Sequence, residues 1–379
     1  MSLTVLVNAG PWLPVPPRGY GGIENIVATL IPELRALGVK VVLASVETST
    51  EPVDELVSVF PDGQFGWIQR PYNQACGVAQ AHLAGVVREL RARDDIDLVH
   101  DHVEAVGLAT LAAMGDDAPP VLHTLHWDLA KHPELYGGFD GGDRVRVNGV
   151  SASQLARAPQ ALQDHAVGHV HLATPLAVDA DRNPPVDKGD YLVMLGRITP
   201  GKGQDVGARL AHEAGFDLVL AGPVGPHQQP DDLARALADP TAAQNPDVRY
   251  WAEQVAPHVD GDRVRWIGTV GGSARDDLVA GARAMLAPLR WEEPGGTFVV
   301  ESLALGTPVV ATARGCLPEL IEHERTGLLA DDEADLADLV IAAEKIDPAE
   351  CRREAARRFT PAVMARRYVE LYEEVARAA

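Results

Sequence analysis

The feature that most constrains the fold is a series of short apolar segments, rich in β-branched residues, that alternate with segments of helical periodicity. The first segment is 4–8 (TVLVN), followed by a predicted helix over 23–37 and a second predicted strand over 39–45. The same unit recurs at 97–102 and again at 191–196. Short runs that are apolar throughout are typical of parallel strands buried on both faces, and parallel strands need a crossover between them, usually a helix. The chain is therefore predicted to be an α/β protein with doubly wound, Rossmann-like domains.

The length of the chain predicts two such domains. At 379 residues it exceeds the size of one ordinary hydrophobic core. Between Thr174 and Asp190 the composition shifts to Pro, Asp and Gly, which is typical of a linker. We therefore expect an N-terminal domain at 1–175 and a C-terminal domain at 188–360. The end of the chain, 361–379, has apolar residues at helical spacing and is predicted to be a long amphipathic helix.

Composition excludes several classes of function. A net charge of −21 argues against binding nucleic acid and against docking on an anionic membrane surface. No apolar run approaches the ~20 residues that a membrane helix requires, and the first residues, MSLTVLVNAG, lack the basic region of a signal peptide. The three cysteines are widely spaced and form no metal-ligand cluster, which suits a reducing compartment. We therefore expect a cytoplasmic protein, a monomer or homodimer, that acts on small molecules.

The most distinctive motif begins at Trp291 and reads WEEPGGTFVVESLALGTPVVATARG. It predicts a loop, a short helix, a glycine stop and a buried strand. Gly295 and Gly296 allow the backbone to approach a ligand closely, and the free N–H groups at the helix start favour an anion. Glu293 and Glu301 are about two helical turns apart, so we expect both carboxylates on one side of this segment.

Two other segments also place glycines before a helix. After the predicted strand at 191–196, Arg197 and Lys202 precede a helix, which predicts a phosphate site with a planar guanidinium, a mobile ammonium and free helix-start N–H groups. The pair Gly21 and Gly22 follows the first strand, although the spaced G-x-G-x-x-G pattern of a dinucleotide fold is missing. The alternatives are ordinary surface cations in the first case and a plain turn in the second.

Histidines occur at the ends of two successive predicted strands, over 100–102 and over 123–126. Ligands of open parallel sheets bind beyond the carboxyl ends of the strands, so these side chains are expected to line a crevice. They suit either a metal ion or the hydroxyls of a sugar. A metal site would need a third ligand at a fitting spacing, and none is local. Buried histidines with a purely structural role are the further alternative. The glycine-rich, aromatic segment over 131–143 is expected to be a flexible loop that shapes an acceptor pocket.

The spacing Glu-x7-Glu, with Pro294 and Gly296 after the first acid, resembles the donor-site signature of the retaining glycosyltransferases of family four. The resemblance covers nearly the whole chain and is most specific in its second half. It implies the GT-B architecture, in which two Rossmann-like domains face each other across a cleft. Domain 1–175 would bind the acceptor and domain 188–360 the nucleotide-sugar donor, while helix 361–379 would pack back on the first domain.

The resemblance also assigns roles to individual residues. Glu293 would contact hydroxyls of the donor sugar, Glu301 the ribose, and Thr269 and Val270 the base through their backbones. Gly295 stands where the family's common pattern has an aromatic residue. The residues so assigned to donor binding are Gly21, Gly22, Arg197, Lys202, Thr269, Val270, Glu293, Gly295, Gly296, Thr297 and Glu301. The catalytic roles would belong to His126, Glu293, Arg197 and Lys202, and the acceptor contacts to His102, His123 and Trp127.

The expected function is therefore that of a retaining, metal-independent glycosyltransferase of the hexosyltransferase type. It would move a sugar from a UDP- or GDP-sugar to a soluble small-molecule acceptor, in natural-product or small-metabolite biosynthesis. We expect no cofactor, because Arg197, Lys202 and loop N–H groups would stabilise the leaving diphosphate. An epimerase acting on a sugar nucleotide in the same architecture is the alternative enzyme. A non-catalytic sugar-nucleotide sensor and a glycan phosphorylase are further alternatives.

Overall fold

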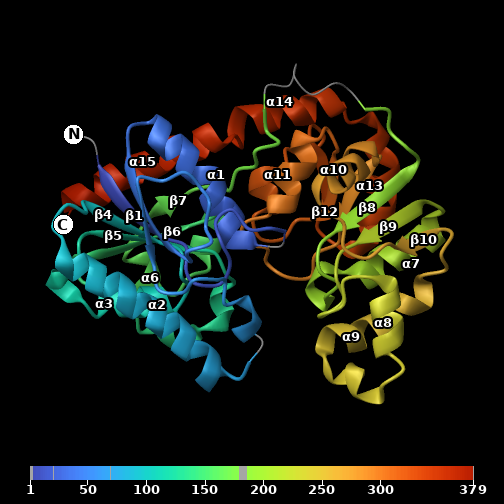
Figure 1. Ribbon diagram of the computed structural model, residues 1–379. Helices are drawn as coiled ribbons and strands as arrows, with labels where there is room; N and C mark the ends of the chain where they lie inside the picture. The colour runs from blue at the N-terminus through green and yellow to red at the C-terminus, as the bar shows by residue number, and fades with distance from the viewer. Residues whose placement is uncertain (1–2, 20, 69, 179–185, 379) are drawn as a thin grey trace. The chain divides into compact units, whose positions relative to one another are not determined.

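The structure, a computed structural model, describes residues 3–19, 21–68, 70–178 and 186–378 (Figure 1). It divides into two compact units, one formed by Met1–Pro175 with Pro361–Ala379 and the other by Leu176–Thr360. Part of the predicted linker, 179–185, lies outside the described residues. Each unit contains one parallel β-sheet with helices packed against it, so the prediction of two Rossmann-like domains is confirmed.

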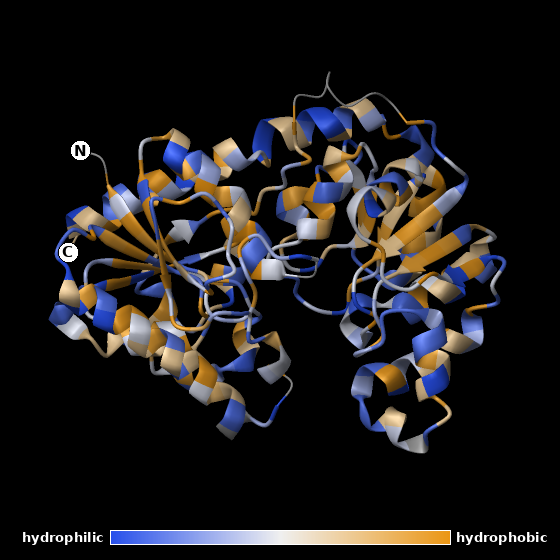
Figure 2. Ribbon diagram, viewed as in Figure 1, coloured by the Kyte–Doolittle hydropathy of each residue, from blue (hydrophilic) through white to orange (hydrophobic). Residues whose placement is uncertain are grey.

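The first unit has a seven-stranded parallel sheet in the order β3-β2-β1-β4-β5-β6-β7. The buried residues of its strands are mostly apolar, and Figure 2 shows the strands mostly in the colours of hydrophobic residues. Such strands exclude water on both faces, which is why the helices cover both sides of the sheet. The strands are β1 Thr4–Asn8, β2 Lys40–Ser45, β3 Glu55–Ser58, β4 Leu98–Asp101, β5 Val121–Leu125, β6 Val145–Gly149 and β7 Ala166–His169.

The two faces of this sheet carry different helices, because successive side chains of a strand point to opposite sides. In β1, Val5 and Val7 belong to a core shared with α1 and α15, whereas Leu6 belongs to a second core shared with α2 and α3. The end of the chain, α15, thus packs within the first unit, where it contacts α1, β5 and β7. The helices are α1 Gly22–Ala36, α2 Tyr72–Ala92, α3 Val106–Ala112, α4 Pro133–Gly137, α5 Ala152–Ala156, α6 Gln160–Gln163 and α15 Pro361–Ala378.

The second unit has a six-stranded parallel sheet in the order β10-β9-β8-β11-β12-β13, with one continuous hydrophobic core. Its strands are β8 Tyr191–Leu195, β9 Asp217–Ala221, β10 Val264–Trp266, β11 Ala284–Ala287, β12 Val309–Thr312 and β13 Gly327–Ala330. Its helices are α7 Gln204–Ala214, α8 Pro230–Ala236, α9 Pro246–Tyr250, α10 Gly272–Gly281, α11 Thr297–Ala304, α12 Leu317–Leu320, α13 Leu336–Ala342 and α14 Pro348–Arg358.

Both sheets have a point where the strand order reverses, between β1 and β4 in the first unit and between β8 and β11 in the second. The loops that leave adjacent strands at such a point diverge and open a crevice, where ligands bind in this class of fold. The loops after β8 and β11 contain Arg197, Lys202 and Glu293, and those after β1 and β4 contain Gly21 and His102.

Several local predictions differ from the structure. The segment expected to be a flexible loop, 131–143, contains the helix α4 and a fully buried Tyr136, so part of it is helical and packed against the core. The run over 264–270, VRWIGTV, has the composition of a strand, but β10 ends at Trp266 and the left-handed Gly268 (φ 74°) turns the chain after it. Among the described helices, none combines the length and the apolar character needed to cross a membrane.

Candidate functional site

The loop after β8 presents a cation and a helix start in the second unit. Arg197 is exposed, and its carbonyl accepts a hydrogen bond of 2.9 Å from Nε2 of Gln204. Gly203 has a left-handed backbone (φ 70°), and a Cβ there would lie 2.1 Å from the carbonyl oxygen of Pro288. Helix α7 follows without a side-chain cap, but the N–H of Asp205 in its first turn already donates to the Tyr250 hydroxyl (3.1 Å), so an anion could bind only the other N–H groups of that turn.

Lys202 lies in this loop and is held by Glu293. Its Nζ is 2.5 Å from Oε2 of Glu293, and it also lies over the rings of Trp291 and Phe298, 5.2 and 4.9 Å from their centroids. The Glu293 side chain is only 11% exposed, which excludes much of the water that would weaken this ion pair. The structure therefore brings two of the predicted residues, 91 positions apart, into direct contact.

Glycines fix the backbone that carries Glu293. Gly315 (φ 56°) packs against it so closely that a Cβ would lie 2.2 Å from the Glu293 carbonyl oxygen. The same carbonyl accepts a hydrogen bond of 2.8 Å from the N–H of Cys316. Gly296 precedes α11 in a left-handed conformation (φ 57°), and Gly295 is buried just before it. The loop from Glu293 to Thr297, at the start of α11, is thus a preformed backbone surface.

Glu301, in α11, has a different partner from Glu293. Arg275 of α10, which the sequence analysis did not identify, donates a hydrogen bond of 3.2 Å from Nη1 to the Glu301 carboxylate. Burial raises the pKa of Glu301, and the Arg275 charge opposes that rise. Arg275 follows a glycine pair at the start of a helix, but it lies 26 positions from Glu301 and no spacing in the sequence relates them.

The predicted base-binding pair, Thr269 and Val270, follows β10. The Thr269 N–H donates to the carbonyl of Gln228 (2.7 Å), and its own carbonyl accepts from Nε2 of Gln229 (3.1 Å). Both backbone groups of Thr269 are therefore already engaged by the segment before α8. Val270 is half-buried beside it.

In the first unit, the structure brings the predicted histidines together. Nδ1 of His102 lies 2.9 Å from Nε2 of His126, with their rings stacked. Burial, with a smaller contribution from the His123 charge, lowers the pKa of His126 to about 3, and burial likewise lowers the pKa of His102. This pair is therefore neutral near pH 7, and one ring donates to the other. His126 is half-buried, whereas His102 is fully buried.

His123 is fully buried on the opposite face of the sheet and binds a carboxylate. Its Nδ1 is 2.6 Å from Oδ2 of Asp101, and Oδ1 of the same carboxylate accepts a hydrogen bond of 2.7 Å from Nδ2 of Asn8. Burial disfavours the charged ring, but the carboxylates of Asp101 and, more distantly, Glu104 outweigh it and raise the pKa of His123. His123 was predicted from the sequence as a site residue, but its partners Asp101 and Glu104 were not, although they lie at and just after the end of β4.

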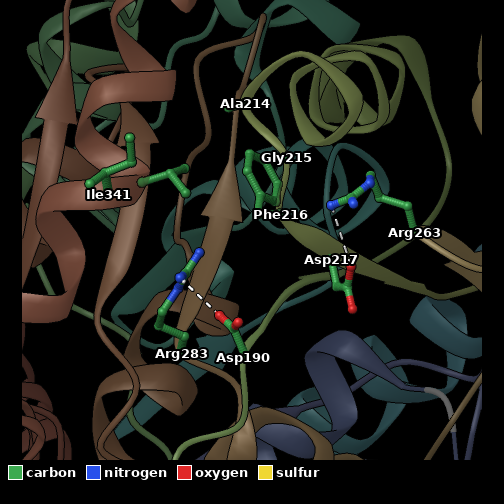
Figure 3. A pocket seen from close by; sticks show the side chains of 9 residues that line it. Asp190, Ala214, Gly215, Phe216, Asp217, Arg263, Arg283 and Ile341 are labelled. Atoms are coloured by element: carbon green, nitrogen blue, oxygen red, sulfur yellow. Dashed lines mark hydrogen bonds and ion pairs between the residues drawn. The ribbon is translucent and has the colours of Figure 1, made fainter.

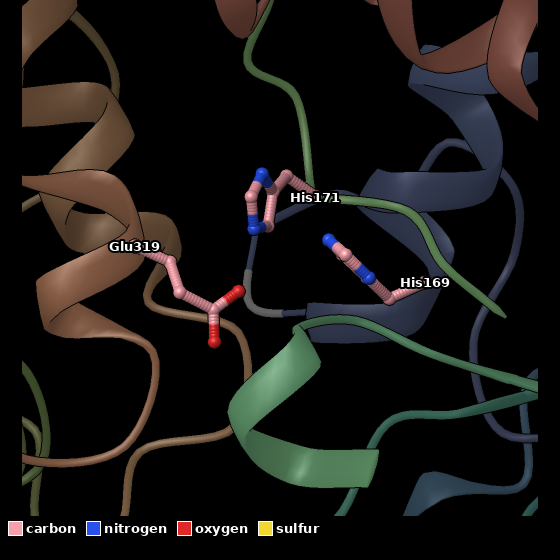
Figure 4. A group of neighbouring side chains, drawn as sticks. All are labelled: His169, His171 and Glu319. Carbon is pink, nitrogen blue, oxygen red and sulfur yellow. The ribbon is translucent and has the colours of Figure 1, made fainter. Parts of the chain in front are cut away.

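The C-terminal helix α15 contributes to the same strand ends. His100 accepts or donates at both ring nitrogens, to the Tyr372 hydroxyl (2.7 Å) and to Thr124 (2.8 Å). Further along the sheet, at the end of its edge strand β7, the half-buried His169 and His171 lie with their ring centroids 5.0 Å apart (Figure 4). Polar side chains therefore follow the carboxyl edge of this sheet from β4 to β7.

The remaining predicted residues of the first unit lie in loops. Gly21 precedes α1, and a Cβ there would lie 2.7 Å from the ring of Pro17, so the proline-rich loop packs directly on this glycine. No heavy atom lies near the corresponding position of Gly22. Trp127 is 37% exposed and carries the ammonium of Lys131 over its ring, 4.5 Å from the centroid.

A separate cavity of about 320 Å³ in the second unit lies at the amino ends of the strands, away from these loops. Its arginines are already paired, Arg283 with Asp190 at 3.0 Å and Arg263 with Asp217 at 3.6 Å (Figure 3). Arg283 also binds Glu344 at 2.9 Å. Because the cavity lies at the amino ends of the strands, whereas ligands of this class of fold bind beyond the carboxyl ends, we assign no anion site to it.

Two family models match the chain. The model described as glycosyl transferases group 1 matches residues 178–360, and the model described as glycosyltransferase family 4 matches residues 20–162. Together they cover parts of both units, including Arg197, Lys202, Glu293, Glu301 and His126.

Curated relatives and solved structures agree with these models. The chain is 29% identical over 358 residues to a D-inositol 3-phosphate glycosyltransferase of Actinosynnema mirum, covering 82% of this chain and 80% of that protein. A protein of the same description from Salinispora tropica is 29% identical over 283 residues, 66% of this chain and 57% of its own length. The crystal structure of AviGT4, a glycosyltransferase involved in avilamycin A biosynthesis, matches with a TM-score of 0.65 and 28% identity, covering 100% of this chain and 99% of that one.

Proposed function

The chain belongs to the group 1 glycosyltransferases of family four, which have the GT-B fold, and on that premise we propose that it is a retaining hexosyltransferase using a UDP- or GDP-sugar. The donor would bind to the second unit, at the loops that follow β8 and β11. The contact between Lys202 and Glu293, beside the uncapped start of α7, is the observation that carries this proposal.

That arrangement suits a sugar diphosphate for electrostatic reasons. Breaking the glycosyl–phosphate bond leaves negative charge on the diphosphate, and Arg197, Lys202 and the α7 N–H groups would stabilise it. Glu293, which holds Lys202, would also bind hydroxyls of the donor sugar. Glu301 would bind the ribose, with the neighbouring Gly295, Gly296 and Thr297 against the donor and Thr269 and Val270 near the base. These cations belong to the chain itself, so we propose that the reaction requires no metal ion.

Residues of the first unit are proposed to complete the reaction. The family pattern assigns His126 to the donor sugar and Gly21 and Gly22 to the donor phosphates. We propose that Trp127, with its exposed ring, contacts the acceptor directly. His102 and His123 are fully buried, so we propose that they hold the residues around the acceptor in place and do not contact the acceptor themselves.

The acceptor is proposed to be a small molecule. Two similar proteins are described as D-inositol 3-phosphate glycosyltransferases, and AviGT4 is described as acting in avilamycin A biosynthesis. We therefore place this chain in natural-product or small-metabolite biosynthesis.

The proposed function is tested by two substitutions in the full chain. Lys202→Ala should weaken binding of the nucleotide diphosphate about tenfold or more, because a charge-assisted contact is lost. Glu293→Ala should reduce sugar transfer more than it reduces binding of the free diphosphate. An unchanged diphosphate affinity in Lys202→Ala would refute the phosphate assignment.

Stereochemistry and acceptor dependence test the reaction class. In a retaining transferase, the product observed by NMR keeps the anomeric configuration of the donor and forms only when an acceptor is present. An epimerase would instead convert the sugar nucleotide without an acceptor, and that result would replace the proposed function.

A further inference from the structure

Glu104, between β4 and α3, has a buried carboxylate that the proposed mechanism does not use. Glu104 is only 5% exposed, and its carboxyl group accepts hydrogen bonds from three donors. Oε2 accepts from the N–H of His126 (3.1 Å), and Oε1 accepts from the N–H of Trp127 (3.3 Å) and from the Tyr136 hydroxyl (2.9 Å). Nε2 of His123 lies 3.9 Å from Oε2.

A strained turn holds this carboxylate in place. The next residue, Ala105, has φ 54° and ψ −62°, and the N–H of Val106 donates to the Glu104 carbonyl at 2.6 Å. These are the features of a γ-turn with positive φ, which is rare and strained for a residue with a Cβ. Gly107 then packs on Asp101, where a Cβ would lie 2.3 Å from Oδ2. Such strain persists only where the surrounding structure over-determines it, and it often marks functional sites.

The contacts of Glu104 require a carboxylate rather than an amide. Two adjacent backbone N–H groups, those of His126 and Trp127, each need an acceptor, and the two carboxylate oxygens supply one each. An amide has only one acceptor oxygen, so a glutamine would leave one of the two N–H groups facing an NH₂ group. His126 and Trp127 are the residues proposed for the donor sugar and the acceptor, and the peptide that joins them is therefore fixed by one buried carboxyl group.

We propose that Glu104 is a positioning residue, which orients the His126–Trp127 turn for sugar transfer. This inference rests on the function proposed above, because His126 and Trp127 matter only if they meet substrates. Glu104 acts through these two residues and does not itself touch a substrate. The strained turn at Ala105 fixes the backbone next to Glu104, and the buried Tyr136 of α4 donates a hydrogen bond to the Glu104 carboxyl group.

The first part of the test needs no ligand. Amide hydrogen exchange, read by NMR or mass spectrometry, is compared in the full-length protein and in Glu104→Gln. One of the amides of His126 and Trp127 should exchange about tenfold faster, as expected for one lost hydrogen bond, while amides of β8 and β11 stay unchanged. Tyr136→Phe is the matched control, because it removes the third hydrogen bond of the carboxylate and leaves both backbone bonds. Unchanged exchange in Glu104→Gln would overturn the inference.

The second part separates positioning from a merely structural role. With UDP-glucose or GDP-mannose as the donor probe, whichever the wild type turns over, Glu104→Gln should lower kcat of sugar transfer at least about tenfold. Its dissociation constant for the free diphosphate should match that of the wild type, and Tyr136→Phe should keep most of the activity. Faster exchange with normal transfer kinetics would show that Glu104 is structural only. If the wild type binds no nucleotide diphosphate, the proposed function fails. The exchange experiment would still show whether Glu104 fixes the amides of His126 and Trp127.

Discussion

At the scale of the residue, the charges of the candidate site are each held by one specific partner. Lys202 binds Glu293, Glu301 binds Arg275, and His123 binds Asp101. Partly or fully buried pairs of this kind fix the direction of a charged side chain before a ligand arrives. The partners Arg275 and Asp101 lie on other elements, so their roles depend on the fold and not on local spacing.

Arg275 gives a prediction about the proposed contact between Glu301 and the ribose of the donor. Arg275→Ala should weaken binding of the nucleotide diphosphate by about 1 kcal/mol, or roughly fivefold, because Glu301 loses the charge that orients it. Calorimetric titration measures this change. Arg235→Ala is the control, since Arg235 is 77% exposed and forms its ion pair with Asp232 on α8. Equal affinities in wild type and Arg275→Ala would contradict the assigned role.

Glu24 gives a prediction about pH. Burial raises its pKa to about 7, against hydrogen bonds from the backbone N–H groups of Glu24 and Leu13. Because the folded-state pKa exceeds the unfolded value, the native state is most favoured below about pH 4.5 and loses stability as pH rises through 7. Glu24→Gln should therefore raise the free energy of unfolding by up to about 3 kcal/mol at pH 8 and change it little at pH 4.

Denaturant unfolding at the two pH values tests this prediction. Glu33→Gln, on the same helix α1, is the control and should show no such difference between pH 4 and pH 8. A stabilisation by Glu24→Gln that is equal at both pH values would show that the buried charge is not its cause.

At the scale of the element, the sequence predicted strands and helices well where the apolar pattern was continuous. The strand at 4–8, the strand at 191–196 and the helix after Gly22 all lie within a residue or two of the structure. The edge strands β3 and β7 were not located from the sequence. Short edge strands bury few side chains, so they lack a continuous apolar run that would indicate a strand. The region 131–143 was predicted to be a flexible loop because it is rich in glycine. Nothing in its local sequence indicates that Tyr136 is buried.

The candidate site was predictable to the extent that its residues lie in one motif. Glu293, Gly296 and Glu301 follow a spacing that can be read directly, and Arg197 and Lys202 follow a strand. Glu104 and Arg275 were not predicted. Each binds a residue that is distant in sequence, and no local motif indicates such a contact.

Gly315 gives a prediction at this scale. Gly315→Ala should destabilise the second unit by about 1–3 kcal/mol and displace Glu293 from Lys202, because the new Cβ would meet the Glu293 backbone. Gly271→Ala is the control: it lies before α10 without a positive φ and with no heavy atom within 4 Å of its Cβ position. Thermal unfolding and diphosphate titration should separate the two variants, and equal behaviour would contradict the account.

At the scale of the whole molecule, the chain forms two units with separate cores, and the first is discontinuous in sequence. Its final helix buries Tyr368, Leu371 and Tyr372 completely. The hydroxyl of Tyr372 binds His100, so α15 supports the strand ends that carry the histidines. The C-terminal segment is therefore part of the first unit in structural terms.

A pair of truncations tests this dependence. A chain that ends at Thr360 should lose the cooperative unfolding of the first unit, because its core is left uncovered, while residues of the second unit keep their hydrogen-exchange protection. A chain that ends at Ala376 keeps every fully buried residue of α15 and should unfold like the full protein. A native first unit in the shorter chain would contradict this role of α15.

The most direct test of the central claim is calorimetric titration of the full-length protein with UDP, GDP, ADP, TDP and NAD, with and without magnesium. We expect that one nucleoside diphosphate binds, that magnesium does not change its affinity, and that Lys202→Ala weakens this binding. Binding of NAD with no binding of any diphosphate would contradict the assignment of Arg197, Lys202 and Glu293 to a sugar-nucleotide donor.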